Sequence, residues 1–167
     1  MIYFIIIRGP LGCGKSAVAR QLATILHAEY IPIDQVLERN RLDKINSRIV
    51  CIPAKNFIRA NEIILPRVKK SLGKGTIVIF DACFYYKKAI QHLIKNLPYA
   101  HYAFTLKAPV EICIERDKNR HKTYGEAAVR GIHKLASRFD YGISIDITRP
   151  LDKSVKEILS YLPKEKV

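Results

Sequence analysis

The feature that most constrains the fold is an apolar run followed at once by a glycine-rich turn. Residues 2–7 are all isoleucine, tyrosine or phenylalanine, and such a run is typical of a central parallel strand buried on both faces. Residues 9–16 read Gly-Pro-Leu-Gly-Cys-Gly-Lys-Ser, which matches the spacing G-x-x-x-x-G-K-S/T at every fixed position. Apolar residues then recur at helical spacing from Lys15 onward. The sequence therefore predicts a strand, a tight turn and a helix in direct succession.

The residue types in this turn suit the binding of a polyphosphate. Glycines let the backbone wrap closely, so that successive N–H groups point at one phosphate, and the following helix presents its positive dipole end to the same anion. Lys15 adds a mobile positive charge, and Ser16 supplies a hydroxyl to Mg²⁺. We therefore expect ATP and Mg²⁺ as cofactors. The expected nucleotide cradle consists of Gly9, Pro10, Leu11, Gly12, Cys13, Gly14, Lys15, Ser16 and Ala17.

The rest of the chain alternates between short apolar runs and amphipathic patterns. Four further strands are expected, at residues 30–33, 76–80, 99–106 and 143–147. Further helices are expected at about 56–72, 89–97, 109–120, 126–138 and 152–162. Strands separated by helices predict an α/β fold, in which a parallel sheet carries helices on both faces. The polar and basic residues 35–55 show no clear pattern.

The chain is strongly basic, with 29 Lys and Arg residues against 15 Asp and Glu residues and a formal net charge of +14. An excess of this size admits an anionic partner such as nucleic acid. The charges are spread along the chain rather than gathered in blocks. The alternative explanation of the positive charge is therefore compositional, a general richness of the chain in Ile and Lys. Nucleic acid therefore stays open as a partner or substrate.

No segment indicates export or a membrane. The first apolar run is too short for a signal peptide, and no stretch approaches the ~18 apolar residues of a membrane span. The cysteines show no metal-binding spacing and are expected to be reduced. We expect a soluble cytoplasmic protein, either a monomer or a homodimer.

Two acidic residues follow expected strands. Ligands gather at the carboxyl ends of the strands in an open α/β sheet, so Asp34 and Asp81 are expected to lie at one rim. Asp81 is expected to hold Mg²⁺ together with Ser16, with capping of the next helix as the alternative. Asp34 is expected to orient an acceptor hydroxyl and accept its proton. Capping of a helix from Gln35 is the alternative for Asp34, and both roles are compatible.

Basic residues mark a further segment, from about residue 110 to residue 138. Arg116 and Arg120 are four apart and are expected to share a helix face. The stretch between and just after them is too polar to pack in a core, which favours a helical lid that closes over the triphosphate. Arg116 and Arg120 would then neutralise charge during transfer, and Arg130 is a weaker candidate. A solvated basic helix end is the alternative.

An acceptor would lie against residues 35–62, where Arg59 is expected either to reach the acceptor or to lie on the surface. Tyr85 and Tyr86 follow Asp81 and are expected either to line this site or to pack in the core. Thr148, Arg149 and Pro150 follow the last expected strand and are placed near the nucleotide base by position alone.

With these motifs, the chain resembles the small P-loop kinases. It looks most like the group that contains the 5′-kinase domain of polynucleotide kinase, chloramphenicol phosphotransferase and zeta toxin. The resemblance rests on residues 9–16, Ile-Pro-Ile-Asp34, Val-Ile-Phe-Asp81, residues 106–120 and residues 145–150. It implies one domain over 1–167 with a three-layer P-loop NTPase fold, whose five-stranded parallel sheet has the order 2-3-1-4-5. It also implies catalysis by Lys15, Asp34, Arg116 and Arg120, with Asp34 as the base.

Three functions are compatible with these residues. The first is an ATP-dependent kinase that moves the γ-phosphoryl group to a hydroxyl of a nucleoside, a nucleic-acid 5′ end or a small alcohol. The second is a nucleoside monophosphate kinase, which needs cations for the acceptor phosphate, and for which Arg41, Arg48 and Arg59 are candidates. The third is a nucleotide-dependent protein that binds nucleic acid.

Overall fold

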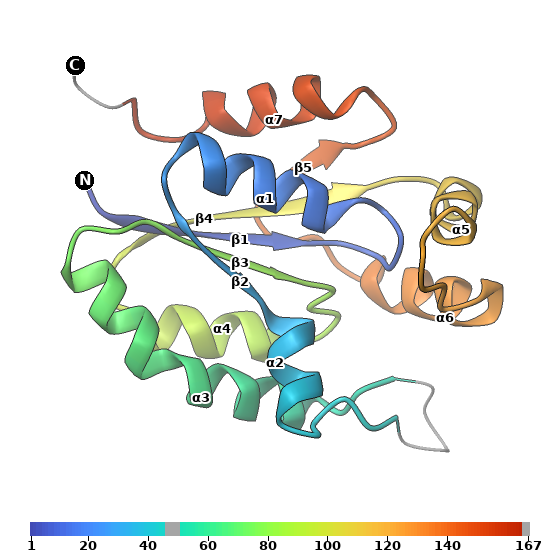
Figure 1. Ribbon diagram of the computed structural model, residues 1–167, viewed down its shortest axis with the longest axis horizontal. Coiled ribbons are helices and arrows are strands. Elements are labelled where there is room, and N and C mark those ends of the chain that lie inside the picture. The colour runs from blue at the N-terminus through green and yellow to red at the C-terminus, as the bar shows by residue number, and fades with distance from the viewer. Residues whose placement is uncertain (46–50, 165–167) are drawn as a thin grey trace.

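The computed structural model describes residues 1–45 and 51–164, and Figure 1 shows a sheet between two layers of helices. In chain order the elements are β1 (Tyr3–Arg8), α1 (Lys15–Ile25), β2 (Glu29–Pro32), α2 (Ile33–Arg39), α3 (Ala54–Gly73), β3 (Val78–Ala82), α4 (Lys87–Asn96), β4 (Ala100–Lys107), α5 (Val110–Lys118), α6 (Glu126–Ala136), β5 (Ile143–Asp146) and α7 (Leu151–Ser160).

The five strands are parallel and follow the order β2-β3-β1-β4-β5, which confirms the implied topology. All six residues of β1 are buried, as its apolar run predicts. Asp81 of β3 pairs in register with Ile7 of β1 and with Pro32 of β2. This register places the Asp81 carboxylate between the turn that follows β1 and the helix that follows β2.

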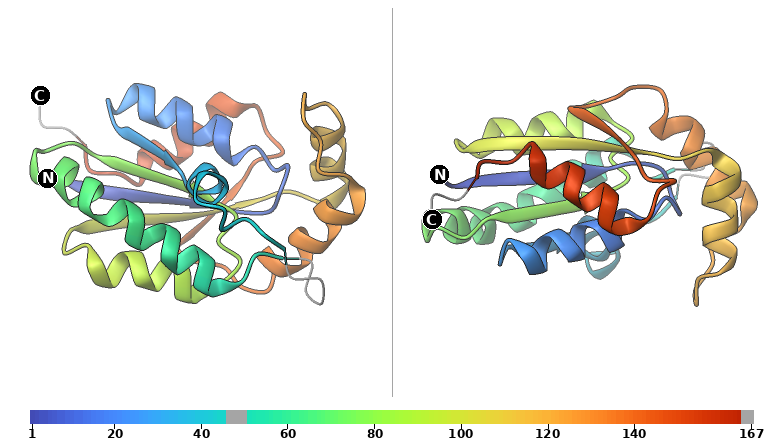
Figure 2. Two further views of the ribbon diagram at one scale, coloured as in Figure 1. Left: turned by 60° about the horizontal axis from the view of Figure 1, so that its bottom comes forward. Right: turned by 90° about the horizontal axis from the view of Figure 1, so that it is seen from above.

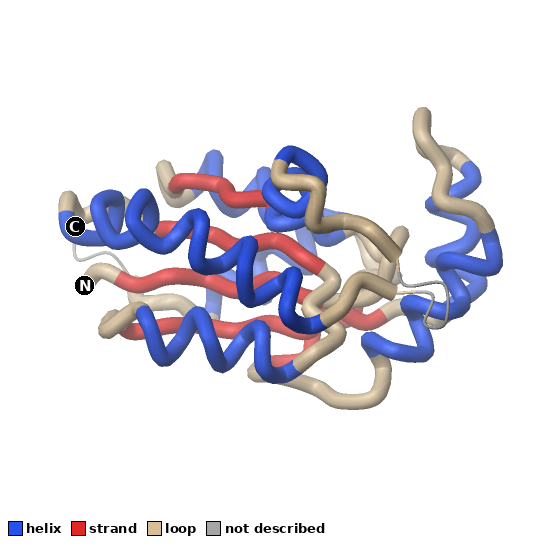
Figure 3. The backbone as a smooth tube through the Cα atoms, turned by 90° about the horizontal axis from the view of Figure 1, so that it is seen from below, coloured by secondary structure: helices blue, strands red, loops and turns tan. Residues whose placement is uncertain are grey.

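The sheet separates two hydrophobic cores, because successive side chains of a strand point to opposite faces. Phe4 and Ile6 face the layer that holds α3 and α4, whereas Ile5 and Ile7 face α1 and α7 (Figure 1). α5 and α6 lie beyond the carboxyl ends of the strands, as the two views in Figure 2 agree. Loops gather at this end of the sheet (Figure 3), so the fold places its adaptable segments beside the glycine turn.

β1 ends in an arginine that is fully buried. The Arg8 guanidinium donates hydrogen bonds to the carbonyls of Phe84 (3.3 Å), Phe139 (2.9 Å) and Ala136 (2.8 Å) and to the Thr105 hydroxyl (3.2 Å). Its charge also lies 4.3 Å from the centre of the Phe139 ring. Arg8 therefore ties the end of α6 to the strand that leads into the glycine turn.

Some element boundaries differ from the expected ones. α2 begins at Ile33, with Pro32 at its N-cap, so Asp34 lies in the first turn and does not cap a helix from Gln35. The reason is that Pro32 is extended and ends the pairing of β2, which leaves the next residue free to turn. α3 begins at Ala54 and contains Pro66. No helix in the described part of the chain is long and apolar enough to cross a membrane.

Candidate active site

The turn between β1 and α1 wraps tightly at two glycines. Gly12 and Gly14 have φ angles of 78° and 100°, a region in which side chains are disfavoured. A β-carbon at Gly12 would also lie 2.5 Å from the carbonyl oxygen of Cys113. α1 starts at Lys15 without a side-chain cap and without an acidic residue in its first turn. Its first N–H groups are therefore available to an anion, which fits the expected phosphate cradle.

Lys15 lies folded back over this turn. Its ammonium group is buried and donates a hydrogen bond of 2.8 Å to the carbonyl of Pro10. Burial alone would lower the pKa of Lys15, but neighbouring acidic groups, including Asp81 and Asp34, raise it above its usual value. The side chain therefore stays charged at neutral pH, as a phosphate ligand must.

Asp81 lies where the sequence places a metal ligand. Its Oδ2 accepts a hydrogen bond from the Ser16 hydroxyl (2.8 Å) and another from the Tyr30 hydroxyl (2.7 Å). Its Oδ1 is buried without a hydrogen-bond partner among the described residues. Such an atom is costly unless a ligand satisfies it, and a carboxylate oxygen beside a hydroxyl suits Mg²⁺. Ser16 and Asp81 thus fit the implied metal, and Tyr30 is a member of the site that the sequence did not reveal.

Asp34 faces the same cavity from the first turn of α2. Its side chain is exposed toward the cleft, but the surrounding walls remove part of its hydration. This desolvation, with a smaller contribution from Asp81, raises its pKa to about 6, while Lys15 and Arg120 oppose the rise. A carboxylate with this pKa suits a general base near neutral pH.

The two arginines of the expected lid have separate surroundings. Arg116 donates hydrogen bonds to the carbonyls of Cys13 (2.6 Å) and Ile147 (2.8 Å), so its guanidinium ties the glycine turn to the loop after β5. Arg120 is exposed and lines the cleft, with its charge 5.3 Å from the Tyr124 ring. The expected shared helix face is wrong, because α5 ends at Lys118 and leaves Arg120 outside it.

The turn between α5 and α6 is organised by a residue that the sequence did not single out. Asp117 is buried, and its carboxylate accepts hydrogen bonds from the backbone N–H groups of Tyr124 (3.1 Å) and Gly125 (3.0 Å). It therefore fixes the segment that carries Arg120. Arg130 lies on the exposed side of α6, where it pairs with Glu126 at 2.9 Å and does not line the cleft.

One cavity of about 420 Å³ brings most of these residues together. Its lining consists of Leu11, Ser16, Arg20, Tyr30, Pro32, Asp34, Gln35, Glu38, Asp43, Ile45, Cys51, Ile52, Phe57, Asp81, Cys83, Tyr85, Arg120, Lys122, Tyr124, Ala128 and Ile132. Tyr85 is part of this lining, whereas Tyr86 and Arg59 are not, and Arg59 pairs with Glu62 at 3.1 Å. Arg41 is exposed outside the cavity, and Arg48 lies outside the described residues.

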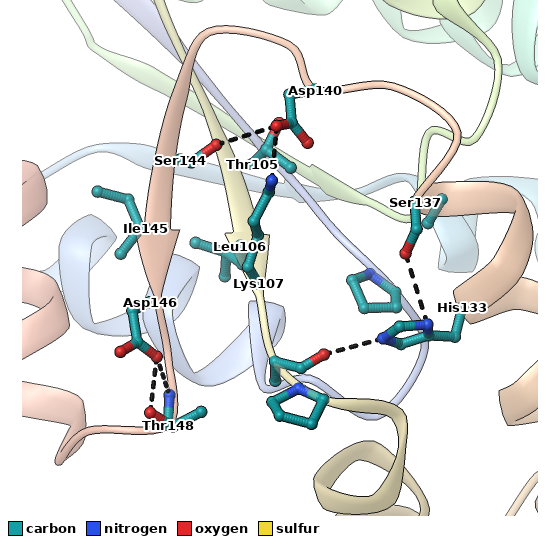
Figure 4. A pocket seen from close by; sticks show the side chains of 14 residues that line it. Thr105, Leu106, Lys107, His133, Ser137, Asp140, Ser144, Ile145, Asp146 and Thr148 are labelled. Carbon is teal, nitrogen blue, oxygen red and sulfur yellow. Dashed lines mark hydrogen bonds and ion pairs between the residues drawn. The ribbon is translucent and has the colours of Figure 1, made fainter.

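A larger hollow of about 620 Å³ lies between β4, β5 and α6 (Figure 4). Its polar side chains are largely paired with one another or with the backbone. Lys107 binds Asp140 at 2.6 Å, Asp146 accepts a hydrogen bond from Thr148 at 2.7 Å, and His133 bonds the carbonyl of Ala108. Because the smaller cavity contains Ser16, Asp34 and Asp81, we assign the chemistry to it rather than to the larger hollow.

Comparison with known proteins agrees with this architecture. No curated protein matches the chain in sequence. A gluconokinase from Sinorhizobium meliloti is 18% identical with a TM-score of 0.72 over 93% of this chain and 89% of that chain. A sugar kinase from Janibacter sp. is 15% identical with a TM-score of 0.77 over 96% and 94% of the two chains. The APS kinase of Mycobacterium tuberculosis is 17% identical with a TM-score of 0.70 over 95% of both chains.

Because the identities are low, these likenesses establish the fold alone. The sequence itself gives the family, because residues 4–140, most of the chain, match the AAA domain. From this match and the P-loop that begins at Gly9, the chain belongs to the AAA domain family.

Proposed function

We propose that this protein is an ATP-dependent kinase that transfers the γ-phosphoryl group to a hydroxyl acceptor. The observation that carries the proposal is the shared cavity, which holds Ser16 and Asp81 at one end and Asp34, with its raised pKa, beside them. Phosphoryl transfer needs this combination of phosphate positioning, metal ligands and a hydroxyl-orienting carboxylate. The fold neighbours named gluconokinase, sugar kinase and APS kinase support the same reaction class.

In this mechanism the backbone N–H groups of residues 12–16 hold the β-phosphate, and Lys15 binds the β- and γ-phosphates. Ser16 and Asp81 would hold Mg²⁺, which would supply positive charge near the phosphate oxygens. Asp34 orients the acceptor hydroxyl and takes its proton as the new O–P bond forms. The bond between the γ-phosphorus and the bridging oxygen breaks, and ADP leaves with that oxygen. Arg120, on the segment that we propose as a lid, neutralises the charge that develops on the transferred group.

The finer likeness to the polynucleotide kinase, chloramphenicol phosphotransferase and zeta toxin group rests on the sequence motifs alone. We keep it as part of this proposal because Asp34 follows β2 and faces the cavity, as the resemblance implies. In that group the acceptor is a hydroxyl rather than a phosphate. The cavity agrees with a hydroxyl acceptor, because Arg41 and Arg59, two of the three candidate ligands for an acceptor phosphate, do not line it.

A phosphoryl-transfer screen tests the proposal. The protein is incubated with Mg²⁺ and γ-labelled ATP against nucleosides, nucleoside monophosphates, 5′-hydroxyl oligonucleotides and small alcohols, and labelled products are separated from phosphate. We expect transfer to at least one hydroxyl compound above the rate of ATP hydrolysis. Hydrolysis without transfer to any acceptor, or transfer to monophosphates only, would contradict the proposal.

A further inference from the structure

Helix α5 rests directly against the P-loop, the turn between β1 and α1 (Figure 1). Arg116 donates a hydrogen bond of 2.6 Å to the carbonyl of Cys13 within that turn. A β-carbon placed at Gly12 would lie 2.5 Å from the carbonyl oxygen of Cys113 and 3.6 Å from the β-carbon of Asp117. Cys113 and Asp117 are four residues apart, so they lie on the same side of the helix. The end of α5 therefore has a fixed place relative to the phosphate cradle.

The carboxylate of Asp117 links this helix end to the turn that follows it. It is buried and accepts hydrogen bonds from the backbone N–H of Tyr124 (3.1 Å to each oxygen) and from that of Gly125 (3.0 Å to Oδ2). None of the ion pairs in the described part of the chain involves Asp117. A buried carboxylate without a paired cation is costly unless hydrogen bonds satisfy it. The bonds to Tyr124 and Gly125 supply that compensation, so Asp117 and the turn stabilise each other.

The same turn carries the Arg120 guanidinium to the cleft. α5 ends at Lys118, so no helix holds Arg120, and its guanidinium makes no hydrogen bond or ion pair with the described residues. Its charge instead lies 5.3 Å from the centre of the Tyr124 ring, and both side chains line the cavity of the candidate active site. Desolvation raises the pKa of Asp34 and the charge of Arg120 opposes that rise, which agrees with a guanidinium that faces this carboxylate. The place of Arg120 therefore depends on the turn and on the Tyr124 ring.

We propose that Asp117 is a positioning residue for phosphoryl transfer, which holds Tyr124, and through it Arg120, at a fixed place relative to the P-loop. The inference rests on the proposed kinase function, in which Arg120 neutralises charge on the transferred group. An arginine on a mobile turn would lose conformational freedom when it meets a phosphate, and that loss weakens the contact. A turn that Asp117 already fixes removes part of this loss, and electrostatic stabilisation is most effective when the donor is preorganised. In this role Asp117 acts through Arg120 and needs no contact of its own with the phosphates.

Two nucleotides that differ in the γ-phosphate provide the test, and neither requires an acceptor. Calorimetry gives the Kd of Mg-β,γ-imido-ATP and of Mg-ADP, and the ratio of the two isolates the contribution of the γ-phosphate. Arg120→Ala and Asp117→Ala should each weaken imido-ATP binding by about tenfold, as expected for the loss of a hydrogen bond to a charged group, and leave ADP binding unchanged. An unchanged ratio in a folded Asp117→Ala protein overturns the inference. A parent protein that binds neither nucleotide counts against the kinase function itself, and the inference falls with it.

The double variant shows whether Asp117 acts through Arg120. If it does, Asp117→Ala adds nothing once Arg120 is absent, and the combined loss stays at about tenfold rather than about 100-fold. Ser154→Ala is the matched control, because Ser154 is also buried and bonds the backbone, at 3.0 Å to the carbonyl of Asp146, but lies on α7 outside the cavity. This control should leave the ratio unchanged even where it lowers the melting temperature. Losses that multiply in the double variant overturn the inference.

Hydrogen exchange tests the structural link without any nucleotide. The amides of Tyr124 and Gly125 should exchange about tenfold faster in Asp117→Ala than in the parent protein. Asp117→Asn keeps one oxygen that can accept both bonds, so its exchange rates and nucleotide ratio should lie closer to those of the parent. Unchanged exchange in Asp117→Ala overturns the inference.

Tyr124→Leu keeps the proposal testable if Asp117→Ala does not fold. This change leaves the backbone bonds to Asp117 in place and removes only the ring beside Arg120. It should shift the nucleotide ratio in the same direction as Arg120→Ala, by about threefold, because the ring restrains the guanidinium. A folded Tyr124→Leu protein with the parent ratio overturns the inference.

Discussion

The two ends of the cleft are built in different ways. The donor end comes from residues 9–16 and from Asp81 on the strand next to β1, so one short segment and one neighbouring strand supply it. The proposed acceptor end comes from α2, the start of α3, the residues after β3 and the proposed lid, which are far apart in the sequence. In the proposed mechanism, phosphates are held by backbone groups and a few fixed side chains, whereas the acceptor meets side chains from several separate elements. Under the proposed function, the reaction class is therefore encoded by one local segment, whereas the acceptor is selected by residues that only the tertiary structure brings together.

The most severe way to break the donor end is to remove its mobile cation. Lys15→Ala should lower kcat by about 1,000-fold, because the charge on the transferred group then lacks its nearest ammonium partner. The side chain bonds only the Pro10 carbonyl among the described contacts, so we expect the fold to persist. Steady-state kinetics measures kcat, and a thermal melt shows whether the fold persists. Lys69→Ala, at an exposed site on α3, is the matched control, and turnover equal to that control would refute the role of Lys15.

The acceptor end should respond differently to the loss of its base. Asp34→Asn should lower phosphoryl transfer by about 100-fold, while the affinity for Mg-ATP stays close to that of the parent protein. The amide keeps the shape of the carboxylate but cannot accept the proton. Transfer rates and calorimetric titration with a non-hydrolysable triphosphate separate the two effects. Equal losses in transfer and in nucleotide affinity would mean that Asp34 serves the donor end instead.

Tyr30 tests the boundary between the two ends, because its hydroxyl donates a hydrogen bond to the Asp81 carboxylate, the proposed metal ligand. Tyr30→Phe removes the hydrogen bond to Asp81 Oδ2 and should raise the Mg²⁺ concentration for half-maximal rate by about tenfold, since outer-shell partners orient metal ligands. Magnesium titration at saturating ATP measures the effect, and the KM for the acceptor should not change. Tyr161→Phe on the exposed part of the carboxyl-terminal region is the control. A change in acceptor KM with an unchanged Mg²⁺ requirement would contradict this placement.

These differences also explain what the sequence could and could not predict. The sheet and the P-loop follow from contiguous patterns, and Asp81 follows from its place near the end of a buried strand. The place of Tyr30 in the site could not be predicted from the sequence, because it depends on the pairing of β2 with β3, which brings the Tyr30 hydroxyl to Asp81. Residues 35–55 show no period because α2 has only seven residues, too few for an amphipathic repeat to appear. The contacts of Arg116 could not be predicted, because its partners are backbone carbonyls, which leave no trace in the sequence.

The smallest expected effect concerns pH and again separates the two ends. The pKa of Asp34 is raised to about 6, so the carboxyl group holds its proton below that pH and can accept one only above it. kcat/KM for the acceptor should therefore rise with pH and reach half of its plateau near pH 6, a loss of about twofold between pH 8 and pH 6. Lys15, whose pKa is raised, stays charged over this range and therefore adds no second transition to the pH profile of kcat/KM. The Asp34→Asn protein should give a flat profile at its lower rate, and a limb near pH 6 that survives in this variant would assign the titration to another group.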